Sequence, residues 1–407
     1  MSNIITFLTL AFFTLACKPI NQQIGNKDII IFNDQAINFN PDKNSTNLQD
    51  TLIKIDNGRI ILKKINLPKY SKDVRVSIET TVISAGDPWD KTGSLFLIPQ
   101  SSEINFLIEN NSFVKLFENN TDQDLFPGVI PNENYLPAVE IMRFMTPFGV
   151  GYFSNDPKLD KRKPVYIPEW EESVVWDQDI THLVSELEGE VWIGAFIDVW
   201  TKEGYELSAK LKFEETKAEI YPKEKTKVIP LVNTCRYTHP QRLYDGFSRN
   251  DLEYTFSIPE GYNKAQLYYI TTGHGGHSGG DEFVQKENSI CINGQEIYKG
   301  IPWRNDCASF RRFNPHSGVW TEKRTARIGN LKTGDTKEME IDEFIASSDY
   351  SRSNWCPGSQ VVPFVFDIDN LNPESNTITI RIPEAQAEKE NELNHWNISA
   401  YIVLSAE

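Results

Sequence analysis

The stretch "SICINGQEIYKG" (Ser289–Gly300) decides the fold class. Asn293 and Gly294 stand between two arms in which apolar and polar residues alternate. An Asn-Gly pair between such arms is the strongest short-range signal for a β-hairpin, because both residues readily adopt the positive φ angles of a tight turn. The sequence therefore predicts two antiparallel strands joined by a two-residue turn.

The same alternation continues through most of the chain. It is clear in "VRVSIETTVI" (Val74–Ile83), in "ELSAKLKFE" (Glu206–Glu214) and in the C-terminal stretches "NTITIRI" and "WNISAYIVLSA". Strands with one buried face have this pattern, because successive side chains point to opposite sides. Only "DITHLVSELEG" predicts a short helix, with Asp179 as N-cap and Gly189 as the stop. Many short strands separated by turn signals indicate all-β sandwiches.

Length and composition predict two domains. The chain has 407 residues, of which 39% are hydrophobic, so each half can bury a core. The polar, lysine-rich segment "YPKEKTKVIP" (Tyr221–Pro230) interrupts the strand pattern, and we place a linker at 219–227. The predicted domains are 28–218 and 228–407, with a long inserted loop at 101–137. We therefore expect an all-β protein of two adjacent eight-stranded antiparallel jelly-roll sandwiches.

The N-terminus predicts export. Residues 1–17 contain a short apolar run that ends at Ala16 and Cys17, as in a bacterial lipoprotein signal, although no basic residue precedes Lys18. We expect a lipoprotein with Cys17 lipidated, at the cell surface, outer membrane or periplasm, or a secreted protein. Any membrane contact would be through that lipid. The four remaining cysteines would then lie where disulfides form.

The charge argues against nucleic acid as a partner. The formal net charge is −16, and no cluster of basic residues stands out along the chain. Affinity for nucleic acid depends on Lys and Arg patches that neutralise phosphates. We therefore expect no nucleic-acid partner.

The glycine-rich stretch "GHGGHSGGDEF" (Gly273–Phe283) admits three interpretations. His274 and His277 could bind a metal, but two histidines fall short of the three protein ligands that a catalytic metal site usually has. A phosphate loop is excluded, because the glycines lack the required spacing before a helix. The third interpretation is that the glycines allow a sharp turn and a close approach to a ligand, after which Glu282 enters the next strand at a domain edge. The alternative is that Asp281 and Glu282 are solvated turn residues.

Three other segments carry chemistry. "SAGDPWDKTGSLFLIP" places Asp90 between a turn and a strand. "FIDVW" places Asp198 in an apolar strand two residues before Trp200, where a carboxylate is costly unless it is paired, and a satisfied structural carboxylate is the alternative. "SRSNWCPG" places Arg352 three residues before Trp355, and arginine beside an aromatic ring often holds an anionic or amide group.

Taken in order, these segments resemble the peptide:N-glycosidase F family, bacterial amidases that remove N-linked glycans. No single motif is decisive, and the resemblance rests on the collinear set, which covers most of both predicted domains. The matching motifs are Trp89-Asp90, "RFMTP" (Arg143–Pro147), Asp198-Val199-Trp200 with "KEGYELS", Asp281-Glu282-Phe283 ahead of "SICIN", and "RSNWCPG" (Arg352–Gly358).

The resemblance implies a cleft between two jelly rolls in which Asp90, Glu282 and Asp198 are the catalytic acids. It implies hydrolysis of the amide between asparagine and N-acetylglucosamine in N-glycoproteins or glycopeptides, without a metal or other cofactor. Two carboxylates in a desolvated cleft can share this work, with Asp90 at the scissile nitrogen and carbonyl and Glu282 at the water, or the reverse. We expect a monomer. The substrate-binding candidates are Trp89, Lys91, Trp200, His274, Phe283, Arg352 and Trp355.

The resemblance also implies a disulfide between Cys307 and Cys356, and leaves Cys235 and Cys291 as buried thiols. The chain departs from the family where Asp198 replaces a glutamate, Phe283 a tryptophan and Lys91 an arginine. These departures keep open a second hypothesis, a surface glycan-binding lipoprotein without catalysis. A third, a copper monooxygenase acting on peptide ends, rests on analogy of fold alone.

Overall fold

The computed structural model describes residues 26–41, 52–70, 73–99, 129–131, 136–216, 225–235, 245–275, 280–369, 371–387 and 393–406. The predicted signal with Cys17 lies outside these residues, as do most of the predicted loop at 101–137 and His277. No helix within the described ranges is long and apolar enough to cross a membrane.

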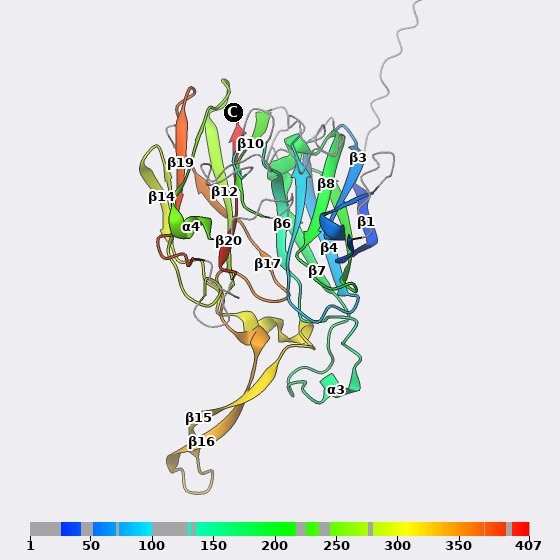
Figure 1. Ribbon diagram of the computed structural model, residues 1–407, viewed down its shortest axis with the longest axis vertical. Coiled ribbons are helices and arrows are strands. Elements are labelled where there is room, and N and C mark those ends of the chain that lie inside the picture. Colours follow the sequence, from blue (N-terminus) through cyan, green and yellow to red (C-terminus); the bar gives the residue numbers. More distant parts are fainter. Residues whose placement is uncertain are drawn as a thin grey trace, which may run out of the picture.

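The chain folds into two antiparallel β-sandwiches that lie side by side, as Figure 1 shows. In the first, a four-stranded sheet packs on a six-stranded one. The four-stranded sheet has the order β1 (Lys27–Ile37), β9 (Tyr205–Glu215), β4 (Val74–Ser84), β7 (Val174–Asp179). The six-stranded sheet has the order β17 (Gln360–Val361), β6 (Val139–Met145), β5 (Thr92–Ile98), β8 (Gly189–Ile197), β3 (Ile60–Leu67), β2 (Ile53–Ile55).

The second sandwich has two sheets of four strands. One has the order β10 (Thr226–Asn233), β20 (His395–Ser405), β12 (Lys264–His274), β18 (Phe364–Asp367). The other has the order β11 (Leu252–Phe256), β19 (Asn376–Arg381), β13 (Asn288–Ile292), β14 (Gln295–Gly300). Apart from β2 and β17, each sandwich has eight strands, and along the chain these strands are assigned to the two sheets in the same order in both sandwiches. The all-β prediction is confirmed, and β2 and β17 extend the first sandwich beyond the eight strands expected for it.

The alternating stretches become strands for the predicted reason. In β4 the even-numbered residues from Val74 to Ser84 are buried and those between them are more exposed. Asn293 and Gly294 form the turn between β13 and β14 with φ angles of 53° and 79°, as a two-residue hairpin turn requires.

Two local predictions are corrected. The predicted helix is a short 3-10 helix, η3 (Thr181–Glu186), because Asp179 ends β7 and Gly189, at φ 65°, begins β8. The Asp179 carboxylate still accepts from the amide of Thr181 at 2.9 Å. The linker prediction extended too far, because Thr226 already begins β10, whose Val228 packs in the core despite its lysine neighbours.

The other helical elements of the described residues are short and lie in the connections: η2 (Asp56–Gly58), α3 (Pro157–Asp160), α4 (Gly246–Arg249), η6 (Ser347–Asp349) and the seven-residue η5 (Cys307–Phe313).

The two sandwiches share an apolar interface. The sheet that contains β12 and β20 has two buried faces, since Tyr269 and Ile402 belong to the second core while Tyr268 and Tyr401 join the first. His182 stacks on Tyr268 with ring centroids 4.0 Å apart, and its Nε2 lies 3.0 Å from the Tyr401 hydroxyl. These contacts fix the two sandwiches against each other, so that loops from both can build one site.

A buried ion pair lies at this interface. The Arg143 guanidinium lies 2.7 Å from the Glu140 carboxylate, and both side chains are fully buried. Arg143 also donates to the carbonyl of Asn397 and to Sγ of Cys235, which belong to the second half of the chain. The arginine of "RFMTP" is therefore a structural residue of the interface.

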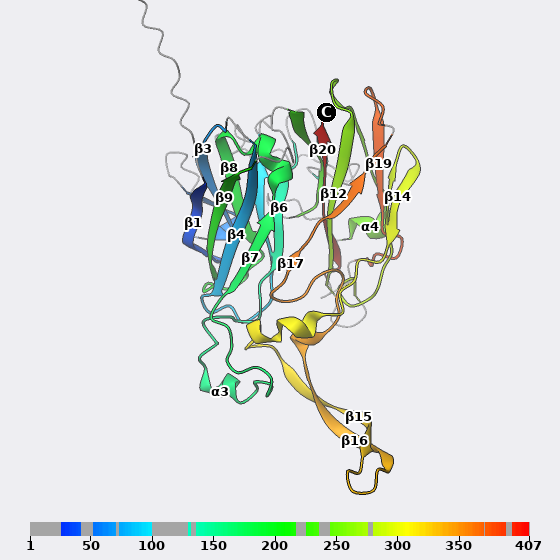
Figure 2. The same cartoon turned by 180° about the vertical axis from the view of Figure 1, so that it is seen from behind.

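A hairpin of β15 (Val319–Gly329) and β16 (Thr336–Ala346) extends away from the sandwiches. In Figures 1 and 2 it leaves the same end of the molecule as the loop that carries α3. The segments η5 and η6 lie at its base. This end of the molecule also holds the residues that the sequence singled out for chemistry.

The predicted disulfide is present between Cys307 and Cys356, while Cys235 and Cys291 are buried cysteines that form no disulfide within the described ranges. The bonded residues are 49 positions apart, and a loop of this size stabilises a fold by about 4 kcal/mol in the chain-entropy model. We expect the Cys307→Ser, Cys356→Ser double variant to lose about this much unfolding free energy. Urea denaturation measures it, with reduced wild type as the control. An unchanged midpoint in both would contradict the prediction.

Candidate active site

Asp90 is held in a turn between β4 and β5. The turn is organised by Asp87, a fully buried residue whose carboxylate accepts from the amide of Trp89 and the hydroxyl of Thr201, both at 2.9 Å. Gly86 has a φ of 134°, and a Cβ there would lie 2.8 Å from Cβ of Glu203, so the turn requires glycine. The buried hydrogen bonds of Asp87 therefore stabilise the turn that carries Asp90.

Glu282 lies in a turn after β12. The prediction that it enters the next strand is wrong, because β13 begins only at Asn288. Gly275 starts this connection at φ 92°, where a Cβ would lie 2.2 Å from the carbonyl of Leu393, and its carbonyl accepts from the amide of Glu282 at 3.3 Å. The steric interpretation of the glycine-rich stretch is therefore supported at Gly275.

The two neighbouring acids of this turn have different environments. The Asp281 carboxylate is buried, and one of its oxygens lies 2.6 Å from Nζ of Lys286 and accepts from the amide of Gln386 at 3.0 Å, so its charge is paired inside the fold. The Glu282 side chain keeps 18% of its surface exposed and faces Arg352. Neither acid is a freely solvated turn residue, so that alternative is excluded.

Arg352 brings the two predicted acids together. Its Nε lies 2.9 Å from Glu282, and its Nη2 lies 3.8 Å from Asp90. The guanidinium also donates to the carbonyls of Tyr350 at 2.9 Å and Ser347 at 2.8 Å, and is 98% buried. Asp90 belongs to the first sandwich, while Glu282 and Arg352 come from the second, so the site exists only at the junction of the two.

Burial sets the protonation of this pair. Desolvation raises the pKa of Glu282 to about 7, the charge on Arg352 opposes this, and the charge on Asp90 adds to it. Desolvation also raises the pKa of Asp90, against the opposing charges of Arg352 and Lys91. With a pKa of about 7, Glu282 can both take up and release a proton near neutral pH, as general acid–base catalysis requires.

The raised pKa of Glu282 gives a prediction for stability. The pKa of Glu282 is higher in the folded protein than the ordinary 4.5. The unfolding free energy therefore falls as pH rises from 4.5 to about 7, and the whole loss is present above pH 7. Glutamine stays neutral at every pH. The unfolding free energy of Glu282→Gln minus that of wild type should therefore increase between pH 5 and pH 9, by up to about 3 kcal/mol. Chemical denaturation at both pH values measures this.

Glu287→Gln is the matched control for that experiment. The Glu287 side chain is 41% exposed, and its only ion pair joins it to exposed Lys299 among the described residues. Its replacement should leave the difference from wild type nearly the same at both pH values. A Glu282→Gln variant that behaves in the same way would show that Glu282 is not desolvated.

Asp198 lies at the same end of the first sandwich as Asp90. It follows the last residue of β8 rather than lying within the strand as predicted, and its amide donates to the carbonyl of Thr92 at 2.9 Å. Its carboxylate is 36% exposed and lies 3.6 Å from the buried guanidinium of Arg59. Asp198 is therefore a partly exposed acid with a buried cationic partner, and it is hydrogen-bonded to the first residue of the strand that follows Asp90.

Arg59 is a site residue that the sequence did not indicate. The guanidinium carbon of Arg59 lies 4.3 Å from the ring centroid of Trp200, and Trp200 also stacks on Phe39. The Asp56 carboxylate pairs with the Arg59 guanidinium at 2.7 Å. This support leaves Trp200 49% exposed in a fixed orientation. No local signal marks Arg59, because its turn resembles many solvated ones.

The other predicted substrate-binding residues divide by exposure. Trp89 is 57% exposed, and Phe283 and Lys91 are partly buried. The guanidinium carbon of Arg352 lies 5.1 Å from the centroid of the Phe283 ring. His274 and Trp355 are almost fully buried, with their rings stacked at 5.3 Å. The indole N–H of Trp355 donates to the carbonyl of Gly273, and the guanidinium carbon of Arg352 lies 4.8 Å from the centroid of the Trp355 ring. Trp355 therefore packs beneath Arg352 in the protein and is almost fully buried.

His274 is a buried residue with a ring nitrogen hydrogen-bonded to a neighbouring hydroxyl. Its Nε2 lies 2.7 Å from the Thr272 hydroxyl, and burial lowers the pKa of its imidazole. Within the described ranges no group of three or more His, Cys, Asp or Glu side chains is placed to hold a metal ion.

Two family profiles match the chain and divide it between them. The profile described as "Peptide-N-glycosidase F, N terminal" matches residues 28–213, and "Peptide-N-glycosidase F, C terminal" matches residues 243–403. The chain belongs to the peptide-N-glycosidase F family. Both matches include site residues, Asp90 and Asp198 in the first and Glu282 and Arg352 in the second.

Solved structures of the peptide-N-glycosidase F family have the same two-domain fold. The chain is 33% identical to PNGF-II over 94% of its length, with a TM-score of 0.76, and spans 66% of the PNGF-II chain. PNGase F, described as a glycosylasparaginase from Flavobacterium meningosepticum, is 15% identical, with a TM-score of 0.59 and coverage of 94% and 96%. At that identity the likeness shows the fold alone. No curated protein sequence matches the chain.

Proposed function

We propose that this protein is an exported glycoamidase that hydrolyses the bond between asparagine and the first N-acetylglucosamine of N-glycoproteins or glycopeptides. The observation that carries the proposal is the convergence of Asp90 and Glu282, from two different sandwiches, on the guanidinium of Arg352. Membership of the peptide-N-glycosidase F family supports the substrate class. The predicted signal with Cys17 motivates export, with a lipid anchor where that cysteine is modified.

The reaction needs a nucleophilic water and a proton for the leaving nitrogen. Water attacks the amide carbonyl, the bond from that carbon to nitrogen breaks, and the products are an aspartate and a glycosylamine. We assign Asp90 to the scissile nitrogen and carbonyl, and Glu282 to the orientation and activation of the water. The pKa of about 7 suits Glu282 to proton exchange near neutral pH, and burial raises the pKa of Asp90 in the same direction.

Arg352 completes this arrangement. Its hydrogen bonds to two carbonyls and its contacts with Phe283 and Trp355 hold the guanidinium rigidly. A fixed cation between two acids limits the rise of their pKa values and keeps both side chains in place. It can also offer hydrogen bonds to the amide or sugar of the substrate.

The exposed tryptophans suit a sugar ligand. Trp89 adjoins Asp90, and Trp200 lies beyond Asp198 on its Arg59 support. Aromatic faces that are held rigidly and left open to solvent can stack on the apolar faces of sugar rings. We place the N-acetylglucosamine core of the glycan on this side of the acids.

The test is a glycan-release assay with a denatured N-glycoprotein in water enriched in heavy oxygen, followed by mass spectrometry of the peptide. The proposal expects aspartate carrying heavy oxygen at each former glycosylation site and a glycan with both core N-acetylglucosamines. A peptide that retains one N-acetylglucosamine would show cleavage of a sugar–sugar bond and contradict the amidase assignment. Binding without release would support the glycan-binding alternative that the changes at Asp198 and Phe283 motivate.

A further inference from the structure

A groove lies between the loop that carries α3 and the base of the projecting hairpin. It has a volume of about 470 Å³. Residues 161–166 of the first sandwich form one wall, and Val319, Phe344 and Ala346 of the hairpin form the other. No role in the proposed chemistry has been assigned to these residues.

The groove carries an unusual amount of exposed apolar surface. Val165 is fully exposed, Phe344 is 77% exposed and Tyr166 is 66% exposed. Large apolar side chains scattered singly over a surface are ordinary, but three around one concavity are typical of an interaction site. The groove therefore suits a ligand with apolar side chains.

The groove is also basic in a strongly acidic protein. Lys161, Arg162 and Lys163 follow one another along its wall, while the chain as a whole carries a net charge of −16. Two acids oppose them: Asp160 pairs with Lys163 at 2.7 Å, and Asp349 lines the groove. Basic residues therefore outnumber acids, and an acidic ligand would be attracted here while the rest of the surface repels it.

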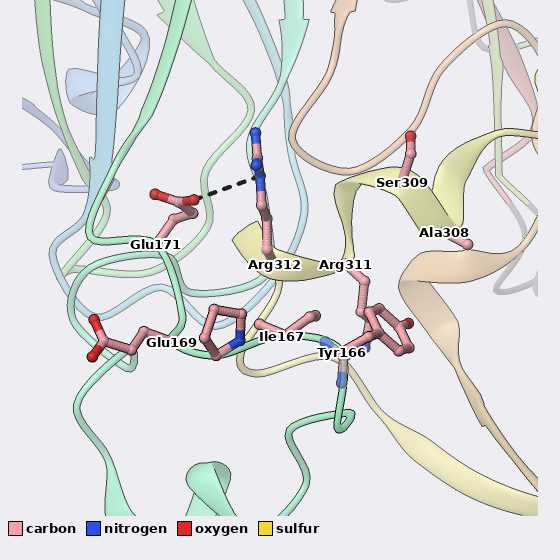
Figure 3. Close-up of a pocket in the computed structure, with 9 residues that line it drawn as sticks. Tyr166, Ile167, Glu169, Glu171, Ala308, Ser309, Arg311 and Arg312 are labelled. Atoms are coloured by element: carbon pink, nitrogen blue, oxygen red, sulfur yellow. Dashed lines mark ion pairs between the residues drawn. The ribbon is translucent and has the colours of Figure 1, made fainter.

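Arg311 lies at the floor between this groove and its neighbour. The neighbouring pocket of about 360 Å³ is shown in Figure 3, where Tyr166 and Arg311 line it and Arg312 points to Glu171, its ion-pair partner at 3.5 Å. Arg311 is 99% buried, and its Nε has no hydrogen-bond partner among the described residues. Its Nη1 donates to the carbonyl of Asn314, so within the described part of the chain the buried guanidinium keeps one unpartnered N–H next to an open groove, and this favours an anionic or carbonyl-bearing ligand.

The groove is joined to the candidate active site by one short segment. The carbonyl of Ser347 accepts from Arg352 at 2.8 Å, and Asp349, two residues later, lines the groove. Tyr350 follows, and its carbonyl also binds Arg352. A polymer whose reactive residue lies at Arg352 could therefore extend into the groove over a short distance.

We propose that this groove binds the polypeptide part of the substrate, as an extended segment with acidic and apolar side chains next to the glycosylated asparagine. The inference rests on the proposed amidase function, because it is the asparagine at Arg352 that brings the polypeptide to the groove. Glycan and polypeptide then lie on opposite sides of the acids, the glycan toward Trp89 and Trp200 and the polypeptide toward Phe344.

The test compares two glycopeptides with the same glycan. One is long and carries acidic and leucine residues beside the asparagine, and the other has one neutral residue on each side. We expect the Lys161→Glu, Arg162→Glu double variant to lose about tenfold in kcat/KM on the long glycopeptide and to keep wild-type kcat/KM on the short one. The Phe344→Ser variant, at an exposed position, should behave in the same way.

The matched control is the Lys332→Glu, Lys337→Glu double variant, which makes the same charge change at the far end of the hairpin. It should retain wild-type kcat/KM on both glycopeptides. Equal rates for all proteins on the long glycopeptide would overturn the inference, and so would equal losses on both glycopeptides.

A binding experiment separates failure of the groove from failure of the amidase. Fluorescence anisotropy with the same long peptide lacking its glycan needs no catalysis. Binding that weakens in the groove variants, together with no glycan release by wild type, would reject the amidase and keep the groove as a peptide site. Glycan release with no binding of this peptide by wild type would overturn the groove inference alone.

Discussion

Asp90→Asn should lower kcat/KM for glycan release by about 10³-fold or more without lowering the unfolding free energy at neutral pH, because burial raises the pKa of the Asp90 carboxyl and so disfavours its charged form in the fold. Asparagine keeps the shape of the side chain, and Asp87 rather than Asp90 holds the turn, so the fold should persist. The loss follows because an amide can neither donate nor accept a proton in the transition state at neutral pH. Release of the glycan, followed by mass spectrometry over time, measures the effect.

Asp28→Asn is the matched control, since its carboxylate is 62% exposed and lies on β1, in a sheet that contributes none of the predicted site residues. It should release glycan at the wild-type rate. Isothermal calorimetry with a glycopeptide adds a second measurement, because Asp90→Asn should still bind the substrate. Full activity of Asp90→Asn would place the chemistry on other residues and would reject the mechanism proposed for this pair.

Arg352→Met should be the most destabilising single change at the site, at about 3–5 kcal/mol of unfolding free energy at pH 8. It leaves the Asp90 and Glu282 carboxylates partly buried without their cation and two carbonyls without a donor. Removal of the charge raises the pKa of both acids further, so each is protonated more readily. The destabilisation should therefore be smaller at pH 5 than at pH 8, as chemical denaturation at both values would show.

Arg381→Met removes an arginine whose ion pair with Asp251, at 2.6 Å, is nearly half exposed. It should cost less than about 1 kcal/mol, because surface ion pairs contribute little. Arg352→Lys keeps a charge but not the planar guanidinium, and should fold better than Arg352→Met while still losing about 10²-fold in glycan release. A similar cost for Arg352→Met and Arg381→Met would show that Arg352 does not neutralise a buried pair.

The sequence predicted the strands well because strand formation depends on near neighbours. Alternation in β4 and the Asn293-Gly294 pair are local signals, and local backbone preference with one buried face is enough to specify them. The prediction failed where local and long-range terms compete. The lysine-rich segment at Thr226 resembled a linker, yet it forms β10 because Val228 and Leu231 find cores to pack against.

The candidate acids were found through a resemblance of motifs rather than through their surroundings. The sequence could not distinguish buried Asp281 from Glu282, since the difference lies in distant partners, Lys286 for the first and Arg352 for the second. It also gave no sign of Arg59, which acts by supporting Trp200 from a different strand connection. Such roles depend on which elements pack together, and no pattern within one segment records that.

By itself, the sequence determined an all-β chain, its hairpin between β13 and β14, and the residue types able to carry amide hydrolysis. These follow from side-chain periodicity, turn chemistry and matching motifs, each of which lies within a short segment. Only the tertiary structure decided that Asp90 and Glu282 share one arginine and that a basic groove opens beside them. The physical reason is that an apolar interface holds two sandwiches together, and loops far apart in the chain acquire their electrostatics only where that interface brings them into contact.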